Sequence, residues 1–522
     1  MGQQSVIKGY VQDKETGEPV ELANVVLLET EYGASTDGHG YYFILNVPPG
    51  LYMLEVNRIG YDTHFQEVYM REGETIALTF ALDKKSYSLD EVAISAARVK
   101  ARTQIKVSEL EVFPTDITRL PSFGSMPDIA QHLQTLPGVI SSGDAGGQIY
   151  IRGGSPVQNK VMMDGAIIYN PFHTSGLYSV FDPDAVRKTE VFSGGFGAEY
   201  GGSLSSVIDV TTRHGNINDY SGKVDVSTIG SKVVLEGPVF RPKPEGKSNA
   251  SFLAYYKTSY FDKAAQSYYS YIDRDLPFSF HDVYGKFSLF SGDVFKANLF
   301  GFSFNDQSGG QGSAFNYNWK NQGFGGNFFI SPPQSLLLMQ IFFAASGFNM
   351  ELNEASYVPR KSGVNSVNLG IRITKYLGDH YFKYGLEVHT LKTDYLYYST
   401  TYNQTEQSNN SSEVSGYCSY FGNYNRFLIR PGVRFILYSV LNKFSLEPRL
   451  SLKYLLTDYF RLKAAGGLYT QNLISATSDR DIVNYFSGYL SAPVNIAATN
   501  GKDYTEYSLQ NAWHVVVGLS LI

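Results

Sequence analysis

The sequence lacks several features that would suit an enzyme or a nucleic-acid-binding protein. It has one cysteine, Cys418, so neither an intrachain disulfide nor a cysteine-based metal cluster can form. Charged residues make up only 18% of the chain, and the formal net charge of −6 argues against general nucleic-acid binding. No run of about 18 apolar residues occurs, so the sequence predicts no membrane-spanning helix.

The motifs of common enzyme classes are also missing. The chain has no GxSxG elbow, no HExxH and no Walker A loop. Asp182 and Asp184 are two residues apart, and we interpret them as the first residues of a short helix in preference to an acid–base pair. We therefore expect no enzymatic activity, no catalytic residue, no cofactor and no metal site.

Aromatic residues and glycine are abundant instead. The chain has 40 Tyr, 34 Phe and 50 Gly, which is unlike an average soluble protein. A large transmembrane β-barrel needs such residues, because aromatic rings lie where hydrocarbon meets headgroups. A soluble β-propeller is the alternative, but the sequence shows no regular blade repeat.

The first 213 residues contain two units joined by a linker. Residues 1–83 hold short apolar runs separated by turn signals such as Pro48-Pro49-Gly50, which indicates a small β-sandwich. Residues 84–106 have mixed charge. Residues 107–213 are short strands cut by glycines, with a helix predicted over 128–136, and glycine's access to positive φ makes this unit compact and sharply turned.

Residues 214–522 alternate apolar with polar or small side chains. This period of two suits transmembrane strands with lipid on one side and a wet lumen on the other, and we count roughly 14 of them. A unit of about 110 residues needs a wide barrel, such as those with 22 strands, to enclose it. We therefore expect the chain to be the N-terminal portion of a longer protein, with its signal peptide removed and Met1 added.

These segments resemble TonB-dependent outer-membrane receptors of Bacteroidetes type. The resemblance is carried by Ile151-Arg152-Gly153-Gly154, by Met163-Asp164-Gly165 and by Glu199-Tyr200-Gly201-Gly202. Residues 1–83 are similar to the carboxypeptidase-regulatory-like domain through Pro49-Gly50-Leu51-Tyr52. The resemblance implies a mainly β protein: a β-sandwich at 1–83, a linker at 84–106, an α+β plug domain at 107–213 and a partial antiparallel transmembrane β-barrel at 214–522.

The linker contains a segment similar to the TonB box, which a periplasmic coupling protein captures by strand addition. The alternative is a plain exit linker of the sandwich. The resemblance implies an outer-membrane location with the N-terminal domain in the periplasm. The implied partners are the TonB-ExbB-ExbD complex, outer-membrane lipid and a small solute. A surface lipoprotein is a further candidate partner, and nucleic acid is not expected to bind. The candidate box consists of Leu89, Asp90, Glu91, Val92, Ala93, Ile94 and Ser95.

Arg152 follows an apolar run and precedes two glycines, so we expect its guanidinium to lie between plug and barrel wall beside a carboxylate. By resemblance, receptors of this family hold the plug in the barrel through such arginines. Glu447, on a predicted barrel strand, is the candidate partner. The alternative is a solvated arginine in the lumen.

The segment after the run at 166–168 offers aromatic and polar groups on a turn. Tyr169, Asn170, Phe172 and His173 are therefore candidate solute contacts. The alternative is an apolar turn buried on the barrel wall, because aromatic residues usually serve packing.

The resemblance implies an energy-coupled importer of a scarce solute. The residues after Gly202 read Ser-Leu-Ser-Ser-Val-Ile-Asp-Val and lack the Ala-Asn-Gly-Val-Ile pattern that we associate with SusC-like glycan importers. We therefore favour a siderophore, vitamin or peptide receptor. The alternatives are a SusC-like glycan importer and a surface binding or adhesion protein without transport.

Overall fold

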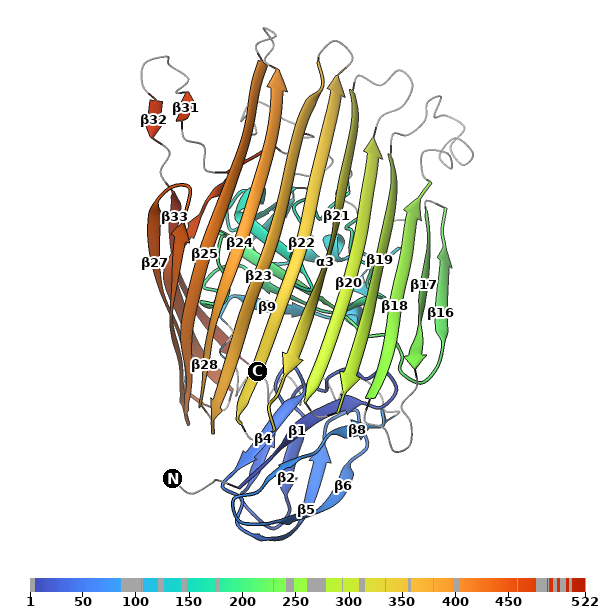
Figure 1. Cartoon of the computed structure of the whole chain (residues 1–522), viewed down its shortest axis with the longest axis vertical. Coiled ribbons are helices and arrows are strands. Elements are labelled where there is room, and N and C mark those ends of the chain that lie inside the picture. The colour runs from blue at the N-terminus through green and yellow to red at the C-terminus, as the bar shows by residue number, and fades with distance from the viewer. Residues whose placement is uncertain are drawn as a thin grey trace.

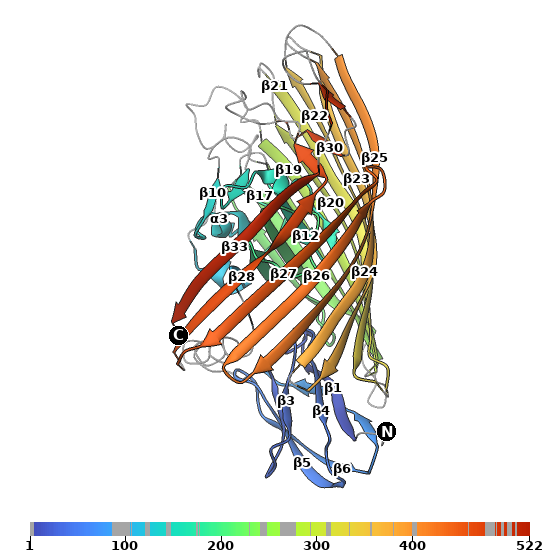
Figure 2. The ribbon, with the colours of Figure 1, turned by 90° about the vertical axis from the view of Figure 1, so that its left-hand side faces the viewer.

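The chain folds into a small sandwich, a plug and one large curved sheet, as the computed structural model shows (Figure 1). Figure 2 shows the plug on the concave side of the large sheet and the sandwich below both. The structure describes residues 5–85, 105, 107–120, 126–141, 148–173, 176, 178–228, 230–240, 248–260, 278–292, 294–308, 315–333, 335–354, 358–378, 380–398, 404–457, 459–475, 486, 488–491, 495–497, 504–506 and 509–521.

The sandwich consists of two four-stranded sheets that bury a shared apolar core, to which Ile7, Val25 and Val56 contribute. In the first sheet, β1 pairs with the other three strands, and in the second the order is β3-β2-β5-β6. The first sheet contains β1 (Val6–Asp13), β4 (Tyr41–Leu45), β7 (Thr75–Ala77) and β8 (Phe80–Leu82); the second contains β2 (Asn24–Leu27), β3 (Gly33–Ser35), β5 (Gly50–Asn57) and β6 (His64–Met70).

The plug is built on a five-stranded sheet with the order β13-β12-β15-β14-β9, beside the hairpin β10-β11. Asp128 caps α3, because its side chain accepts a hydrogen bond from the N–H of Ala130 at 2.8 Å. The elements are β9 (Glu109–Val112), α2 (Pro114–Thr118), α3 (Ile129–Gln134), β10 (Val139–Ser141), β11 (Ile149–Ile151), η2 (Pro156–Gln158), β12 (Asn159–Met163), β13 (Ala166–Ile167), β14 (Val186–Phe192) and β15 (Ser206–Thr212).

The expected helix after Asp182 is wrong. The side chain of Asp182 accepts a hydrogen bond from the N–H of Asp184 at 2.9 Å, which closes a turn that leads directly into β14. An aspartate side chain bonded two residues ahead stabilises a turn as readily as it caps a helix, so sequence alone did not separate the two.

The large sheet has 14 antiparallel strands, which confirms the predicted architecture and number. It is not closed among the described residues, since β16 and β33 are its two edges. In sheet order the strands are β16 (Ser221–Val226), β17 (Gly230–Phe240), β18 (Ser248–Ser259), β19 (Phe278–Ser291), β20 (Phe295–Ser308), β21 (Phe315–Ile330), β22 (Leu337–Glu354), β23 (Arg360–Leu377), β24 (His380–Tyr398), β25 (Gln404–Tyr424), β26 (Phe427–Tyr438), β27 (Lys443–Leu455), β28 (Phe460–Gln471) and β33 (Gln510–Leu521).

The sheet has an apolar outer face and a polar inner face. On β24, Leu386 and Val388 are exposed on the convex side while Glu387 between them is buried towards the plug. Two short hairpins complete the fold, β29 (Leu473–Ser475) with β30 (Tyr489–Ser491) and β31 (Asn495–Ala497) with β32 (Tyr504–Glu506). Within the described parts of the chain, every helix is too short or too polar to cross a bilayer.

The first sheet of the sandwich packs against the lower ends of the large sheet. Tyr10 and Tyr41 share a buried cluster with Tyr376 of β23. The ammonium of Lys296 lies 3.7 Å from the centroid of the Tyr10 ring, which is a cation–π contact. The Tyr376 hydroxyl donates a hydrogen bond to Asp37. These contacts fix the sandwich beneath the plug.

A cavity of about 800 Å³ lies between the sandwich, the plug and the large sheet. Asp37 lines it from the sandwich, Lys188 and Glu199 from the plug, and Arg372 and Arg430 from the large sheet. The underside of the plug therefore meets a space lined by charged as well as aromatic side chains.

Replacing Tyr376 by alanine should loosen the sandwich. Losing a buried aromatic ring typically costs about 3–5 kcal/mol, so we expect hydrogen–deuterium exchange to accelerate more than about tenfold in β1 and β4. The second sheet, β5 and β6 included, should exchange as before. Tyr424→Ala, at an exposed strand end, is the matched control. Unchanged exchange in β1 and β4 would contradict this role for Tyr376.

Candidate functional site

The candidate site is the interface between the plug and the inner face of the large sheet. The turn from Tyr169 to His173, predicted to contact a solute, follows β13 and packs on this face. Phe172 and His173 are 6% and 2% exposed, as in the buried turn that was the alternative. Phe172 nevertheless lines the same small cavity as Tyr169, so solute contact by Phe172 stays a prediction. The carbonyl of Tyr169 accepts a hydrogen bond from the Tyr489 hydroxyl at 2.8 Å.

Tyr169 and Asn170 line a second, smaller cavity of about 110 Å³, together with Lys160 and Glu387. A space of this size holds a few water molecules. Solute contact by Tyr169 and Asn170 stays a prediction, whereas the closed surroundings of His173 point to a structural role.

His173 joins the plug to two strands of the large sheet. Its Nε2 lies 2.9 Å from Oδ2 of Asp282 on β19, and its Nδ1 lies 3.3 Å from Oδ2 of Asp306 on β20. The ring stacks on Phe280 with a centroid distance of 4.0 Å. Burial alone would lower the pKa of His173, but the two carboxylates outweigh burial and raise its pKa to about 9. The imidazole is therefore a cation that donates from both nitrogens.

Plug aspartates meet lysines on the same side of the sheet. Lys232 lies 3.1 Å from Asp182 and 2.6 Å from Asp184, and Lys223 lies 2.9 Å from Asp184. Lys232 is only 6% exposed, so its charge needs these partners. Four consecutive strands each contribute one lysine to the plug contact, which we call the lysine wall: Lys223 of β16, Lys232 of β17, Lys257 of β18 and Lys286 of β19.

The other two lysines of the wall bind plug backbone as well as carboxylates. Lys257 donates to the carbonyl of Ser179 at 2.6 Å and lies 3.7 Å from Asp128. Lys286 lies 3.5 Å from Asp164, and it also donates to a nearby backbone carbonyl of β15 at 3.0 Å. Each ammonium therefore has both a charged and a neutral acceptor.

At the other end of the sheet, arginines hold the plug segment 197–202. Arg449 of β27 donates from Nη1 to the carbonyls of Gly197 and Tyr200, both at 2.5 Å. Its Nη2 lies 2.6 Å from Glu447. Glu447 in turn accepts hydrogen bonds from the backbone N–H and the hydroxyl of Thr470, at 2.8 and 2.6 Å. These contacts hold the buried guanidinium of Arg449 in one orientation.

Two further arginines come from β26. Arg430 pairs with Glu199; burial alone would raise the pKa of Glu199, but Arg430 outweighs it and lowers that pKa to about 2. Arg434 lies 3.0 Å from Glu387 and passes so close to Gly201 that a Cβ there would lie 2.3 Å from Nε. Glycine at this position therefore admits the arginine. We call the three residues Arg430, Arg434 and Arg449 the arginine clamp.

The structure does not bring Arg152 and Glu447 together, which corrects the predicted pair. Arg152 is exposed with φ of 48°, and its N–H donates to the carbonyl of Gly138. Glu447 is fully buried and pairs with Arg449, two residues away on the same strand face. The prediction placed the cation on the plug, whereas the large sheet supplies it. Period-two spacing could have indicated the arginine clamp, since Arg430 and Arg434 share one face of β26.

The segment from Leu89 to Ser95, predicted as the TonB box, lies outside the described residues. Its role therefore stays a prediction. The first plug strand after it, β9, pairs at the edge of the plug sheet with β14.

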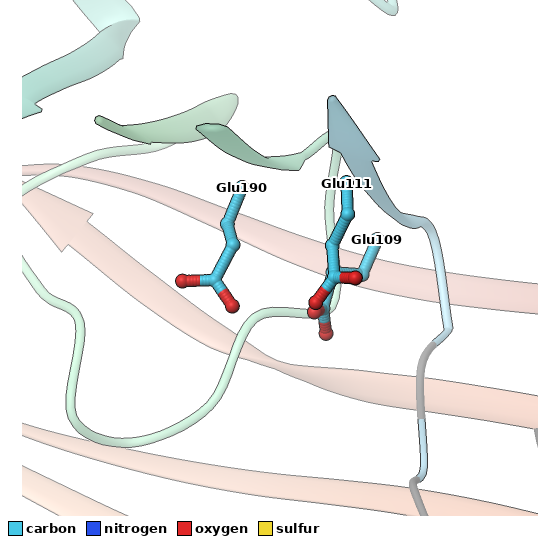
Figure 3. A group of neighbouring side chains, drawn as sticks. All are labelled: Glu109, Glu111 and Glu190. Carbon is cyan, nitrogen blue, oxygen red and sulfur yellow. The ribbon is translucent and has the colours of Figure 1, made fainter. Parts of the chain in front are cut away.

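Three carboxylates project from β9 and β14 towards one another (Figure 3). Glu109, Glu111 and Glu190 each offer an oxygen, and these oxygens lie within 4.8 Å of one another. Oxygen ligands suit a hard divalent cation. Lys188 already lies 2.9 Å from Glu190 and neutralises part of this charge.

The protonated His173 gives a pH-dependent stability. Its pKa in the folded protein, about 9, exceeds the ordinary value of 6.5, so its contribution is complete below about pH 6.5 and is lost as pH rises through about 9. We expect His173→Gln to lower the unfolding free energy by about 3 kcal/mol near pH 6 and to change little near pH 10. Denaturant unfolding at several pH values measures this, with His64→Gln, an exposed histidine, as control. A deficit that is constant with pH would contradict it.

The arginine clamp predicts a large loss of stability when Arg449 is replaced and almost none when Arg152 is replaced. Arg449→Gln leaves Glu447 buried without its cation, which we expect to cost about 3–5 kcal/mol and to speed hydrogen exchange in residues 197–202. Arg152→Gln should change stability by less than about 0.5 kcal/mol, because its side chain is exposed. Equal losses from both substitutions would restore Arg152 as a holding residue.

Comparison with known proteins agrees with this geometry. Residues 7–94 match the family of CarboxypepD_reg-like domains, and residues 119–207 match the TonB-dependent Receptor Plug Domain. Over 255 residues the chain is 28% identical to the TonB-dependent receptor SusC of Bacteroides thetaiotaomicron, which covers 46% of this chain and 24% of SusC. The chain thus spans about a quarter of the length of this curated relative.

Solved structures share the fold. The siderophore receptor PirA from Acinetobacter baumannii superposes with a TM-score of 0.58 at 15% identity, covering 84% of this chain and 70% of PirA. A mutant of the ferric enterobactin receptor PfeA from Pseudomonas aeruginosa gives 0.53 at 14% identity, covering 72% and 63%. Two domain families are therefore matched, and the solved structures show a shared fold. Together these matches confirm the predicted resemblance: the chain has the periplasmic CarboxypepD_reg-like domain, the plug and the strand architecture of a TonB-dependent receptor of the outer membrane.

Proposed function

We propose that the chain belongs to an importer that binds a scarce solute outside the cell and releases it inward when a periplasmic coupling protein rearranges the plug. The observation that carries this proposal is the way the plug is held. The plug has its own five-stranded sheet on the concave side of the large sheet, and ionic contacts fix it at both ends, at the lysine wall and at the arginine clamp. Such contacts can break and form again without unfolding the sheet.

The proposed handle is Leu89 to Ser95. A pull on this segment reaches β9 first, because β9 is the first strand of the plug and pairs only with β14 among the described strands. An extended segment offers its backbone for strand addition by a coupling protein. The proposed partners are the TonB-ExbB-ExbD complex, outer-membrane lipid and a small solute, with a surface lipoprotein as a further partner to be tested.

Two classes of solute compete. The sequence pattern after Gly202 favours a siderophore, vitamin or peptide, and the compared solved receptors bind siderophores but share the fold alone with this chain. SusC, the curated relative, shares sequence over 255 residues, which favours the glycan alternative. We keep the siderophore, vitamin or peptide class as the proposal and include glycans in the test.

Transport should depend on the handle. In cells carrying the full-length protein, we expect Val92→Pro to abolish uptake, because proline removes a backbone N–H needed for strand addition, while surface binding of the solute persists. Val92→Thr keeps the extended preference and should leave uptake within about twofold of wild type. Growth of a deletion strain on defined iron, cobalamin, peptide and glycan sources identifies the solute.

A surface binding or adhesion protein without transport would give another result. Val92→Pro would then change neither growth on any solute nor attachment of cells, and wild-type cells would take up nothing through this protein. That outcome would reject the importer.

A further inference from the structure

The second sheet of the sandwich, with the order β3-β2-β5-β6, carries large apolar side chains that are exposed. Leu51 and Met53 of β5 are 63% and 42% exposed, and Phe65 and Tyr69 of β6 are 54% and 61% exposed. Outer faces of a sandwich usually carry polar residues at such positions. We call these four side chains the apolar patch.

The strand register makes the patch continuous. Leu51 lies opposite Tyr69 in the β5–β6 ladder, and Met53 lies opposite Glu67. Side chains at such opposed positions are neighbours on one face. Glu67 is exposed between Phe65 and Tyr69 on β6. Neither strand contains a lysine or an arginine, so the patch is apolar and acidic.

The outer edge of β6 is open among the described residues. β6 ends the order β3-β2-β5-β6, and its seven residues pair with β5 in an unbroken register. Soluble proteins commonly protect such an edge with lysine, proline or a bulge. β6, with the sequence HFQEVYM, has none of these. Its backbone can therefore accept another strand.

The apolar patch also faces away from the large sheet. Tyr10 and Tyr41, which dock the sandwich on the large sheet, belong to the other sheet. Figure 1 shows β5 and β6 at the end of the sandwich farthest from the large sheet. Docking and the apolar patch thus use opposite faces, and the patch remains open to the periplasm while the sandwich is docked.

We propose that β6 binds an extended segment of a periplasmic protein by strand addition, and that this segment alternates apolar and basic side chains. Side chains on one face of a strand recur every second residue. A strand added to β6 places apolar residues beside Phe65 and Tyr69 and a lysine or arginine beside Glu67. This docking site is separate from Leu89 to Ser95 and does not depend on transport.

The register can be tested with two synthetic peptides. One has the sequence Thr-Val-Thr-Lys-Thr-Val-Thr, and the other has glutamate in place of lysine. Fluorescence anisotropy measures their binding to the full-length protein in lipid nanodiscs, at peptide concentrations up to about 1 mM. We expect saturable binding of the lysine peptide and about fivefold weaker binding of the glutamate peptide.

Substitutions in β6 test whether the peptides bind at the apolar patch. Glu67→Lys should reverse the preference between the two peptides, and Phe65→Ser combined with Tyr69→Ser should abolish binding. All three side chains are exposed, so the core of the sandwich stays intact, which thermal unfolding verifies. Val440→Ser, at an exposed position in the turn between β26 and β27 and far from the patch, is the matched control and should bind as wild type.

Three outcomes would overturn the proposal. The first is no saturable binding of either peptide, and the second is binding that survives in the double serine variant. The third is a Glu67→Lys variant that keeps the wild-type preference, because the surface would then take any apolar segment without the proposed register.

Discussion

Compensation of buried charge determines how the plug sits in the large sheet. Lysines and arginines on the inner face would be costly without partners, because a buried ion loses its hydration. Each residue of the lysine wall and of the arginine clamp contacts a plug carboxylate, a plug carbonyl or a glutamate of its own sheet. Apolar packing adds to these contacts, because plug residues such as Phe181 share one buried cluster with residues of the large sheet such as Tyr284.

The two ends of the sheet meet this requirement differently. The lysine wall faces aspartates that close turns or cap a helix of the plug, such as Asp182 and Asp128. In the arginine clamp each guanidinium contacts a glutamate, and Arg449 also binds two carbonyls of a glycine-rich segment. A planar guanidinium reaches two carbonyls at once, whereas an ammonium serves as a compact charge. Replacing lysine by arginine, or the reverse, is therefore not conservative at either end.

Much of the architecture could be predicted from sequence. The alternation of apolar and polar residues predicted the 14 strands, because one face of each strand meets lipid and the other does not. The glycines that separate short strands indicated the plug. The holding contacts could not be predicted, because they join residues far apart in the sequence: Lys232 and Asp182 are 50 positions apart, and Arg449 and Gly197 are 252 apart. The Arg152–Glu447 pair failed for this reason. His173 was noticed as a candidate, but nothing in its neighbourhood in sequence indicates Asp282 or Asp306.

The 800 Å³ cavity beneath the plug has a consequence for how easily the plug can move. Glu199 and Arg430 both line this space, which has room for water molecules on the order of tens. When Glu199 and Arg430 separate, water from the cavity can hydrate both charges. This hydration replaces the lost attraction and so lowers the energy barrier to movement of the plug. His173, enclosed between aromatic rings, has no such supply of water. Among the clamp residues, Arg430 is therefore the one whose contact with the plug separates most easily, whereas the contact of His173 with Asp282 and Asp306 resists movement.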